Sequence, residues 1–517
     1  MNSKKPHRSA AVIDIDSNAL KMKVAQLKKG KIADIDILEY PMRLGYEVFR
    51  NGKISFESLR ELSSLLHGYQ DVLAGYGVKN VKTVATTALR EAENRSFIMD
   101  QLRIQNGIPV EVLEDNQEKA LIYWEVLNYL GKSEQRKSES ALICYIGAGS
   151  VGIAVYDGNE IIFSQNIPMG SLRLHDMLDN MQNMTENFDT VIDEYLNSIL
   201  CHINIPLESG KADHLILTGN GVRLIGKVCA FDVTDGKHEL DALRLHDCFE
   251  KIRKMPQNQI SKKYNFPEET SELLYSSLAI AVKLLQYTTS AAILAPNVDL
   301  WDALLHQMLI PKSREQYQRH VCASATACAR KIADYYCCNR AHAECVREFS
   351  CKIFDKMKKI HGLDSKERLL LELAAILHEC GHYVTAKQHL QSTFDIIKDT
   401  DIYGLTDEAI LLTAFVARHN EYDVPNLENT SFASLSDKNR LIVSKLVAIF
   451  RLANALDKSQ KQKLSNIKVC FKKEHLTISV QSDADLYLEQ WAFAQCAPYF
   501  REVFGCKPEL ILKSNLL

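Results

Sequence analysis

The chain has 517 residues, of which 46% are apolar, and 62 Lys and Arg against 65 Asp and Glu give a formal net charge of −3. This apolar fraction excludes a largely disordered chain, and the length predicts three or four domains of about 100–200 residues each. A charge so close to zero excludes a protein that works mainly by coating nucleic acid or an acidic membrane.

Signals for membrane insertion or export are not expected from this sequence. The chain contains no run of about 18 uncharged apolar residues, which argues against a transmembrane helix. The apolar run after the basic start is too short for a signal peptide. The 14 cysteines are scattered and form no C-x-x-C pair, a usage typical of free thiols in a reducing cytosol. We therefore expect a cytoplasmic protein with no membrane partner and no specific nucleic-acid partner.

Three short strands are predicted at the start of the chain. Residues 11–15 are apolar and β-rich, residues 20–24 alternate between apolar and polar, and residues 32–38 follow a second turn. Further along, residues 81–85 form another predicted strand that ends in Thr86-Thr87 and precedes two helical segments. These elements predict a mixed α/β domain.

The same strand pattern returns later in the chain, at residues 142–146, 151–156 and 161–167. Setting Asp14 against Tyr145 aligns the two units at an offset of 131 residues. This period is too long for a solenoid, whose repeats run about 20–50 residues. The sequence therefore predicts two similar α/β domains, at residues 1–135 and 136–308.

The character of the sequence changes from about residue 314. Apolar residues now recur at helical spacing, as at Leu369, Leu373 and Leu377, which predicts an all-helical domain over residues 309–463. Beyond it, alternating apolar residues at 467–471 and 476–480 predict a hairpin, and a helix is expected at 488–504. Residues 464–517 would thus form a small α/β unit.

A turn of small residues between two strands can direct several backbone N–H groups at one anion and lets a phosphate approach closely. Gly147-Ala148-Gly149-Ser150 has this composition, and Ser150 adds a hydroxyl. A plain β-turn is the alternative, but repetition at the matching place of a duplicated fold favours a phosphate clamp. Asp14, at the end of the first strand, is placed to hold Mg²⁺, which prefers carboxylate and water oxygens.

Five segments carry a resemblance to a known family. In chain order they are Asp14-Ile15-Asp16-Ser17-Asn18 and residues 85–94, 145–150, 168–174 and 217–221. They resemble the D-x-G-S-N-S, A-T-S-A-x-R-x-A-x-N, D-I-G-G-G-S, G-x-x-R-L and later glycine-loop segments of the exopolyphosphatase and guanosine pentaphosphate phosphohydrolase (Ppx/GppA) family. This resemblance implies a duplicated actin-like (ribonuclease H-like) ATPase fold, followed by a helical HD-type domain and a small α/β tail.

The resemblance also implies an activity. Family members remove terminal phosphate from polyphosphate, or the γ-phosphate from pppGpp, with Mg²⁺. Asp14 would hold the metal, Arg90 would grip phosphate oxygens, and Glu118 would position and deprotonate the attacking water. The expected phosphate contacts are Ser17, Asn18, Arg90, Gly147, Ala148, Gly149 and Ser150. Polyphosphate or guanosine penta- or tetraphosphate is the expected partner, and a homodimer is the expected assembly.

Several acidic or small residues of the family pattern are replaced. Asp16 stands in place of glycine, Tyr145 of an aspartate, Gly152 of a glutamate and Gln117 of the first glutamate of a pair. Loss of metal ligands would slow turnover, because the metal neutralises developing charge. Asp16 would repel a phosphate unless Mg²⁺ or a lysine intervenes. Two functions stay open: a slow phosphoanhydride hydrolase, and a binding or regulatory protein that has lost the chemistry.

Histidines in the helical region admit two interpretations. His378-Glu379-Cys380-Gly381-His382 reads as H-E-x-x-H, a zinc metalloprotease pattern when it lies on one helix, and this is retained as a distant alternative. By resemblance to HD-type domains, the same region would be the remnant of a His, His-Asp, Asp metal site. That remnant comprises His342, His378, Glu379, His419 and Asn454.

Overall fold

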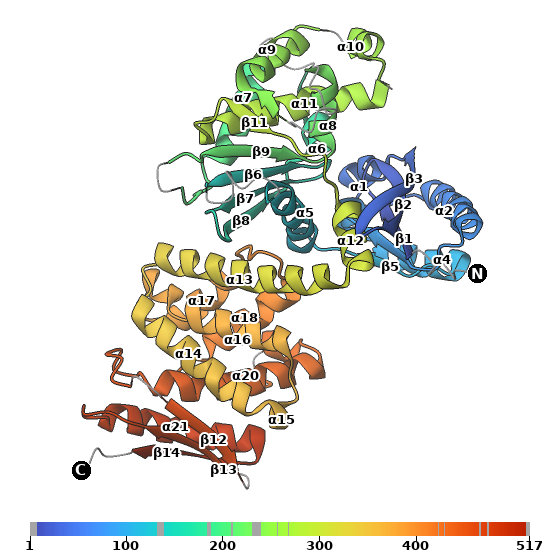
Figure 1. Cartoon of the computed structure of the whole chain (residues 1–517). Helices are drawn as coiled ribbons and strands as arrows, with labels where there is room; N and C mark the ends of the chain where they lie inside the picture. Colours follow the sequence, from blue (N-terminus) through green and yellow to red (C-terminus); the bar gives the residue numbers. More distant parts are fainter. Residues whose placement is uncertain are drawn as a thin grey trace. The chain divides into compact units, whose positions relative to one another are not determined.

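The computed structural model describes residues 8–131, 139–182, 188–207, 210–229, 239–255, 257–266, 268–421, 423–428, 430–464, 467–472 and 475–512. The chain folds as two compact units, Met1–Ser324 and Ala325–Leu517 (Figure 1). The predicted boundary at 135/136 lies outside the described residues. Within the described ranges, no helix combines the length and the apolar character needed to cross a bilayer.

The first sheet of the first unit has five strands in the order β3-β2-β1-β4-β5. Its strands are β1 (Ser9–Ile15), β2 (Ala19–Lys28), β3 (Lys31–Pro41), β4 (Val81–Ala85) and β5 (Val110–Val112). The first three strands pair antiparallel, whereas β1, β4 and β5 run parallel to one another. The carboxyl ends of β1, β4 and β5 therefore meet at one edge of the sheet.

The second sheet repeats this topology. Its strands are β6 (Ala141–Ile146), β7 (Val151–Tyr156), β8 (Ile161–Ile167), β9 (His214–Thr218), β10 (Glu239–Asp241) and β11 (Ala292–Leu294). The order β8-β7-β6-β9-β11-β10 matches the first sheet strand for strand and adds β10 at one edge. Strands β6, β9 and β11 are again parallel. The duplication that the sequence predicts is confirmed.

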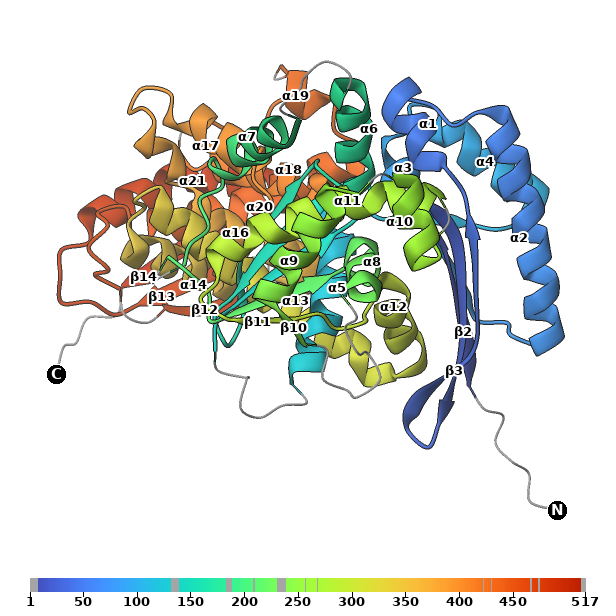
Figure 2. The ribbon, with the colours of Figure 1, turned by 90° about the horizontal axis from the view of Figure 1, so that it is seen from above.

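Helices cover these sheets because their apolar faces match the buried strands. In α2, for example, Ser55 caps the N-terminus by accepting a hydrogen bond from Ser58 N–H, and Gly77 ends the helix at φ 67°. Its buried leucines share one core with β1 and β2, and Figure 2 shows α2 and α4 beside this sheet. The helices of the unit are α1 (Leu44–Asn51), α2 (Phe56–Tyr76), α3 (Thr87–Glu91), α4 (Arg95–Asn106), α5 (Asp115–Leu130), α6 (Ser171–Gln182), α7 (Phe188–Leu200), α8 (Asn220–Val228), α9 (Ala242–Arg253), α10 (Gln257–Tyr264), α11 (Glu268–Leu284), the 3₁₀ helix η2 (Leu285–Tyr287) and α12 (Leu300–Leu309).

The second unit is helical up to residue 455, and α13 (Pro311–Tyr335) runs into it from the first unit. Its other helices are α14 (Arg340–Lys356), α15 (Lys358–His361), α16 (Ser365–Leu377), η3 (Cys380–Tyr383), α17 (His389–Lys398), α18 (Asp407–Arg418), α19 (Thr430–Ala433) and α20 (Asp437–Ala455). Mixed α/β sheets followed by a helical region are thus confirmed.

A three-stranded sheet follows α20. Strands β12 (Ile467–Lys472) and β13 (His475–Val480) pair antiparallel, and β14 (Lys507–Leu512) joins β13 in parallel after α21 (Tyr487–Phe504). Leu476, Ile478 and Phe500 are fully buried in the same core as the helices. The sequence analysis did not predict β14, because this strand is short and its partner β13 lies before α21 in the chain.

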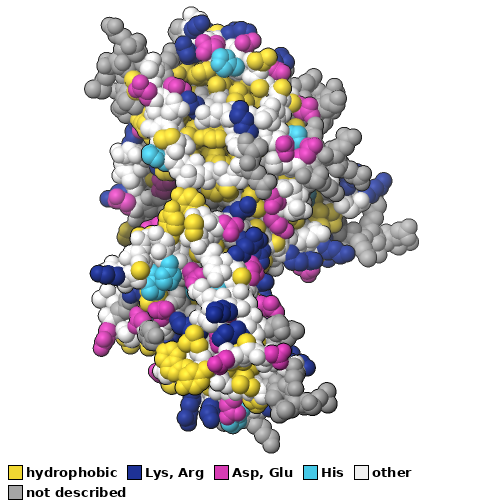
Figure 3. Space-filling view, turned by 90° about the vertical axis from the view of Figure 1, so that its left-hand side faces the viewer, with side chains coloured by type: hydrophobic (Ala, Val, Ile, Leu, Met, Phe, Trp, Pro, Cys, Tyr) yellow, Lys and Arg dark blue, Asp and Glu magenta, His cyan; other side chains and the backbone are white. Residues whose placement is uncertain are grey.

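Acidic and basic side chains are interspersed over the face of the molecule drawn in Figure 3. This distribution agrees with the formal net charge of −3.

Candidate functional site

The sequence-predicted site residues of the first unit lie at the carboxyl ends of parallel strands. Asp14 is near the end of β1, Arg90 follows β4 in α3, and Glu118 follows β5 in α5. The Gly147–Ser150 turn follows β6, between β6 and β7, and Asn220 opens α8 after β9. The two sheets thus place these residues within one unit, and the contacts below join residues from both sheets.

A buried ion cluster surrounds the first loop. Lys21 Nζ lies 3.0 Å from Asp16 Oδ2 and 3.9 Å from Asp299 Oδ2, and the Lys21 side chain is only 2% exposed. Asn220 donates to Asp16 Oδ2 at 2.8 Å and accepts from Lys21 at 3.2 Å. Burial tends to raise the pKa of Asp16, but the charge and hydrogen bond of Lys21, with smaller help from Ser17 N–H, outweigh burial and lower it. Lys21 is therefore the lysine that makes a carboxylate at position 16 tolerable.

Asp14 differs from its neighbours because it has no such partner. It is 4% exposed, and its Oδ1 is buried with no hydrogen-bond partner among the described residues. Burial raises the pKa of Asp14 well above its usual range, and the charge of Lys21 opposes this only in part. Ser17 Oγ is likewise buried without a described partner. These two oxygens are available to a cation and to a phosphate.

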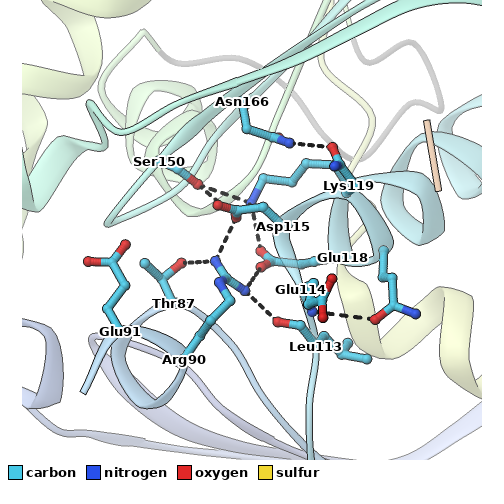
Figure 4. Close-up of polar contacts among 12 residues, drawn as sticks. Thr87, Arg90, Glu91, Leu113, Glu114, Asp115, Glu118, Lys119, Ser150 and Asn166 are labelled. Atoms are coloured by element: carbon cyan, nitrogen blue, oxygen red, sulfur yellow. Dashed lines mark hydrogen bonds and ion pairs between the residues drawn. The ribbon is translucent and has the colours of Figure 1, made fainter. Parts of the chain in front are cut away.

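A second ion cluster joins Arg90 to the start of α5 (Figure 4). Arg90 donates to Asp115 Oδ1 at 2.6 Å, to Glu118 Oε2 at 3.2 Å and to the Leu113 carbonyl at 2.6 Å. Burial would lower the pKa of Arg90, but Glu118 and Asp115 outweigh burial and raise it. The guanidinium that was expected to face phosphate is thus held by two carboxylates.

Lys119 completes this cluster. Its ammonium donates to Glu118 Oε1 at 3.0 Å, to Asp115 Oδ1 at 3.1 Å and to Ser150 Oγ at 3.1 Å, and its side chain is 1% exposed. Burial tends to raise the pKa of Asp115, but Lys119 and Arg90 outweigh burial and lower it. Both oxygens of Glu118 are consequently engaged by cations, one by Arg90 and the other by Lys119.

Backbone hydrogen bonds hold the Gly147–Ser150 turn in place. The carbonyls of Gly147, Ala148 and Gly149 accept hydrogen bonds from the N–H groups of Ser171, Leu172 and Gly170 at 2.9–3.1 Å. The N–H groups of Ala148 and Gly149 donate to none of the described residues. A Cβ on Gly149 would lie 2.5 Å from Thr87 Cγ2, so only glycine fits there. The turn therefore offers two free donors beside the Ser150 hydroxyl.

The first loop is held differently. Asn18 is half-buried, and its carbonyl accepts from Met42 N–H at 2.9 Å. The Ser17 carbonyl accepts from Gly45 N–H at 2.8 Å, and a Cβ on Gly45 would lie 2.8 Å from Ser17 Cβ. These backbone bonds fix the loop beside α1.

The two family carboxylates missing from the sequence are replaced by packing. Tyr145 is 7% exposed, its ring lies 4.9 Å from Lys119 Nζ, and burial raises its pKa, with the charge of Glu118 as the next cause. A Cβ on Gly152 would clash with the Tyr123 hydroxyl and lie 2.9 Å from Lys119 Cγ. Lys119 thus fills the space next to Gly152, and its charge lies among the remaining carboxylates.

Sequence reasoning named neither lysine. Lys119 directly follows Glu118, and Lys21 interrupts the apolar face of β2. A lysine in an otherwise buried stretch was the available signal, because lysine is almost never fully buried unless it is paired. Asp299 and Arg223, which pair at 3.3 Å, carried no such signal.

Asp16, Glu114 and Asp115 are the acidic residues that could supply oxygens in place of the missing carboxylates, but none of them is free to bind a metal. Asp16 and Asp115 are paired with lysine or arginine as described, and Glu114 forms a capping box with Gln117 at the start of α5. Mg²⁺ is commonly bound by one or two carboxylates together with waters and substrate phosphates. The unpartnered oxygen of Asp14 fits this requirement for one protein ligand.

A histidine pair lies in the core of the second unit. His342 Nδ1 lies 2.8 Å from Asp457 Oδ2, and His378 Nδ1 lies 2.8 Å from the Ala375 carbonyl. Their two Nε2 atoms face each other at 3.3 Å, and a carboxylate oxygen of Glu379 lies within 4.8 Å. Two imidazole nitrogens therefore lie beside a carboxylate oxygen.

The structure corrects two sequence expectations here. His419 lies outside this group of ligand atoms, and the Asn454 amide donates to the Asn420 carbonyl at 3.1 Å. The metalloprotease pattern requires one continuous helix, but α16 ends at Leu377 and residues 380–383 form a 3₁₀ turn. His382 stacks on His389 at 4.0 Å rather than facing His378, so the protease alternative is wrong.

Comparison with known proteins gives two family matches. The model of the Ppx/GppA phosphatase family matches residues 23–302, and the model of Ppx/GppA phosphatase domain III matches residues 325–495. The crystal structure of the Aquifex aeolicus member of the Ppx/GppA protein family is similar, with 21% identity and a TM-score of 0.51 over 59% of this chain and 99% of that chain. An exopolyphosphatase from Cytophaga hutchinsonii is similar at 18% identity and a TM-score of 0.52, over 58% of this chain and 97% of that one. At these identities the likeness shows a common fold.

Proposed function

Because the chain belongs to the Ppx/GppA phosphatase family, we propose that it hydrolyses phosphoanhydrides and releases terminal phosphate from polyphosphate or pppGpp. The observation that carries this proposal is the convergence of Asp14, Arg90, Glu118 and the Gly147–Ser150 turn at the carboxyl ends of the strands. Each is a residue type that phosphoryl transfer uses for positioning or charge neutralisation.

In this proposal the terminal phosphate binds the N–H groups of Ala148 and Gly149 and the Ser150 hydroxyl. Ser17 Oγ, buried and without a described partner, is a further donor from the first loop. Lys119 donates to Ser150 Oγ at 3.1 Å, and Arg90 donates to Asp115, which also accepts from Ser150 Oγ at 3.4 Å. Both cations would neutralise phosphate charge from the side. Fixed donors of this kind act without reorganisation in the transition state.

Asp14 would hold Mg²⁺ through its unpartnered Oδ1. When bound, the ion would neutralise charge on the phosphate oxygens. No other acidic side chain described at this site is without an ion pair or cap, so the remaining Mg²⁺ ligands would be water and substrate.

Glu118 would position and deprotonate the attacking water. Its two oxygens already accept from Arg90 and Lys119, one from each, so the water must use the remaining lone pairs. Substrate phosphate can compete for those two cations and so release the carboxylate. We propose slow turnover for this reason, together with the absence of carboxylates at Tyr145 and Gly152.

Phosphate release from polyphosphate and from pppGpp, measured with Mg²⁺, tests the assignment. Glu118→Gln should lower the rate about a hundredfold or more, the scale for loss of a general base. Glu125→Gln is the matched control, because Glu125 is a buried glutamate of the same helix that pairs with His306 at 2.6 Å. A Glu118→Gln rate equal to that of the wild type would show that another group activates the water.

A binding or regulatory role is the second candidate. The observation that favours it is the double engagement of Glu118, because each of its carboxylate oxygens accepts from a cation of the site. This role predicts tripolyphosphate or pppGpp binding by the wild type without phosphate release. Release that depends on Glu118 would reject it.

We further propose that residues 309–463 form an HD-type domain with a divalent metal site at His342, His378 and Glu379, and that residues 464–517 are its small α/β companion. Support comes from the two Nε2 atoms, which lie 3.3 Å apart near a carboxylate oxygen of Glu379, so that one cation could take all three as ligands. The Asp457 carboxylate and the Ala375 carbonyl contact the opposite nitrogens of the two rings and fix the orientation of each imidazole.

Metal content after purification and zinc titration by calorimetry test this site. His342→Gln should abolish binding of one zinc ion per chain. His361→Gln is the control, because His361 is equally buried in this unit but uses both ring nitrogens in hydrogen bonds, at 2.9 Å each. Equal zinc binding by the wild type and His342→Gln would reject the site.

A further inference from the structure

A solvent-open hollow of about 390 Å³ lies in the second unit, between the ends of α18 and α20 and the start of α21. Arg451 and Asn454 come from α20, Asn420 and Glu421 follow α18, Lys458 follows α20, and Trp491 belongs to α21.

Arg451 is the unusual residue of this hollow. It is 6% exposed, and its Nε and Nη1 are buried without a hydrogen-bond partner among the described residues. The nearest aromatic contact is the Tyr499 ring, 5.8 Å from the guanidinium carbon. A buried charge without a partner is costly, and an arginine fork matches a phosphate or carboxylate. An anionic ligand would satisfy these donors.

The one carboxylate that lines the hollow is already occupied. Glu421 accepts from Lys458 Nζ at 3.4 Å and lies 3.7 Å from His389 Nε2. The lining therefore carries two cations, Arg451 and Lys458, against one acidic group. A phosphate monoester offers three acceptor oxygens to these two cations, one more than a single carboxylate offers.

Two further groups define the rest of the ligand. Asn420 donates from Nδ2 to the His378 carbonyl at 3.1 Å, which leaves its Oδ1 buried and without a described partner, so the ligand must also offer a donor. Trp491 is 44% exposed at the hollow and presents a large ring on which a planar group can stack.

We propose that this hollow binds a nucleoside phosphate. The phosphate lies on Arg451 and Lys458, a sugar hydroxyl or base amine donates to Asn420 Oδ1, and the base stacks on Trp491. The site is separate from the strand-end residues of the first unit, and it does not depend on the proposed hydrolysis.

Calorimetry on the full chain with GMP, guanosine and inorganic phosphate tests this proposal. GMP should bind more tightly than either fragment. Arg451→Met should weaken GMP binding at least about tenfold, the effect of losing one charge-assisted contact. Trp491→Ala should weaken GMP but not inorganic phosphate. Arg440→Met, on the same helix and paired with Asp437, should change GMP affinity less than about twofold.

A thermal melt without ligand provides a second readout. Because Arg451 is buried and has no ion-pair partner among the described residues, Arg451→Met should melt no lower than the wild type. GMP should raise the melting temperature of the wild type only. Absence of GMP binding, equal GMP affinity for the wild type and Arg451→Met, or inorganic phosphate binding as tightly as GMP would each overturn the proposal. If Arg451→Met does not fold, unchanged GMP affinity in Trp491→Ala overturns it.

Discussion

Replacing Asp14 by asparagine tests the role of the one unpartnered carboxylate at the strand ends. The wild-type side chain is 4% exposed, and its Oδ1 has no described hydrogen-bond partner. A buried unsatisfied group costs about 1–3 kcal/mol, and more when it is charged, so we take about 2 kcal/mol as the gain from removing the charge. The first unit spans Met1–Ser324, and at about 2.1 cal/mol/K per residue its melting entropy is about 0.7 kcal/mol/K. Without divalent metal, Asp14→Asn should therefore melt about 3 °C above the wild type.

Magnesium should reverse this order. A ligand at a hundred times its Kd stabilises the folded state by about 2.7 kcal/mol, which corresponds to about 4 °C for this unit. We expect this rise in the wild type and less than about 1 °C in Asp14→Asn, measured by scanning calorimetry with EDTA and then with excess Mg²⁺. Asp193→Asn, an exposed aspartate paired with Lys283, should behave as the wild type. If Asp14→Asn melts below the wild type in EDTA and Mg²⁺ shifts both proteins equally, the assignment of Asp14 is refuted.

Three further predictions follow from buried partners. Asp16→Gly, which by charge alone should ease phosphate approach, should instead destabilise the first unit by about 3–5 kcal/mol in a thermal melt, because it removes the closest carboxylate partner of Lys21. Tyr145→Asp alone should leave the rate of phosphate release within about threefold of the wild-type rate, because the new carboxylate would pair with Lys119. The double variant with Lys119→Ala should raise this rate about tenfold, if the new carboxylate is then available as a second metal ligand. Burial lowers the pKa of His361, so the folded state favours the neutral imidazole. The free energy of unfolding should therefore be highest above about pH 6.5 and should fall by up to about 1.4 kcal/mol per pH unit below it. Urea unfolding should show a smaller slope in His361→Gln. A slope unchanged in His361→Gln would assign the acid sensitivity to other groups.

The sequence by itself predicted the strands that open each α/β domain, the duplication, and the position of Asp14 at the end of the first strand. These features depend on short-range periodicity and on turns between neighbouring strands, which a linear sequence displays directly. It also showed that acidic residues were missing at Tyr145 and Gly152. It could not show what replaced them, because the replacement depends on contacts between distant segments.

Only the tertiary structure decided which charges are paired. Lys21 meets Asn220, which lies 199 residues away, and Lys119 meets Ser150 across the two sheets. The same holds in the second unit, where Asp457 Oδ2 lies 2.8 Å from Nδ1 of His342, a residue 115 positions away in the chain. Arg451 belongs to a segment that the sequence analysis did not assign to a site, and its missing partners are visible only once its neighbours are in place. Side-chain pairing depends on distance and burial in three dimensions, and neither follows from residue type and spacing along the chain.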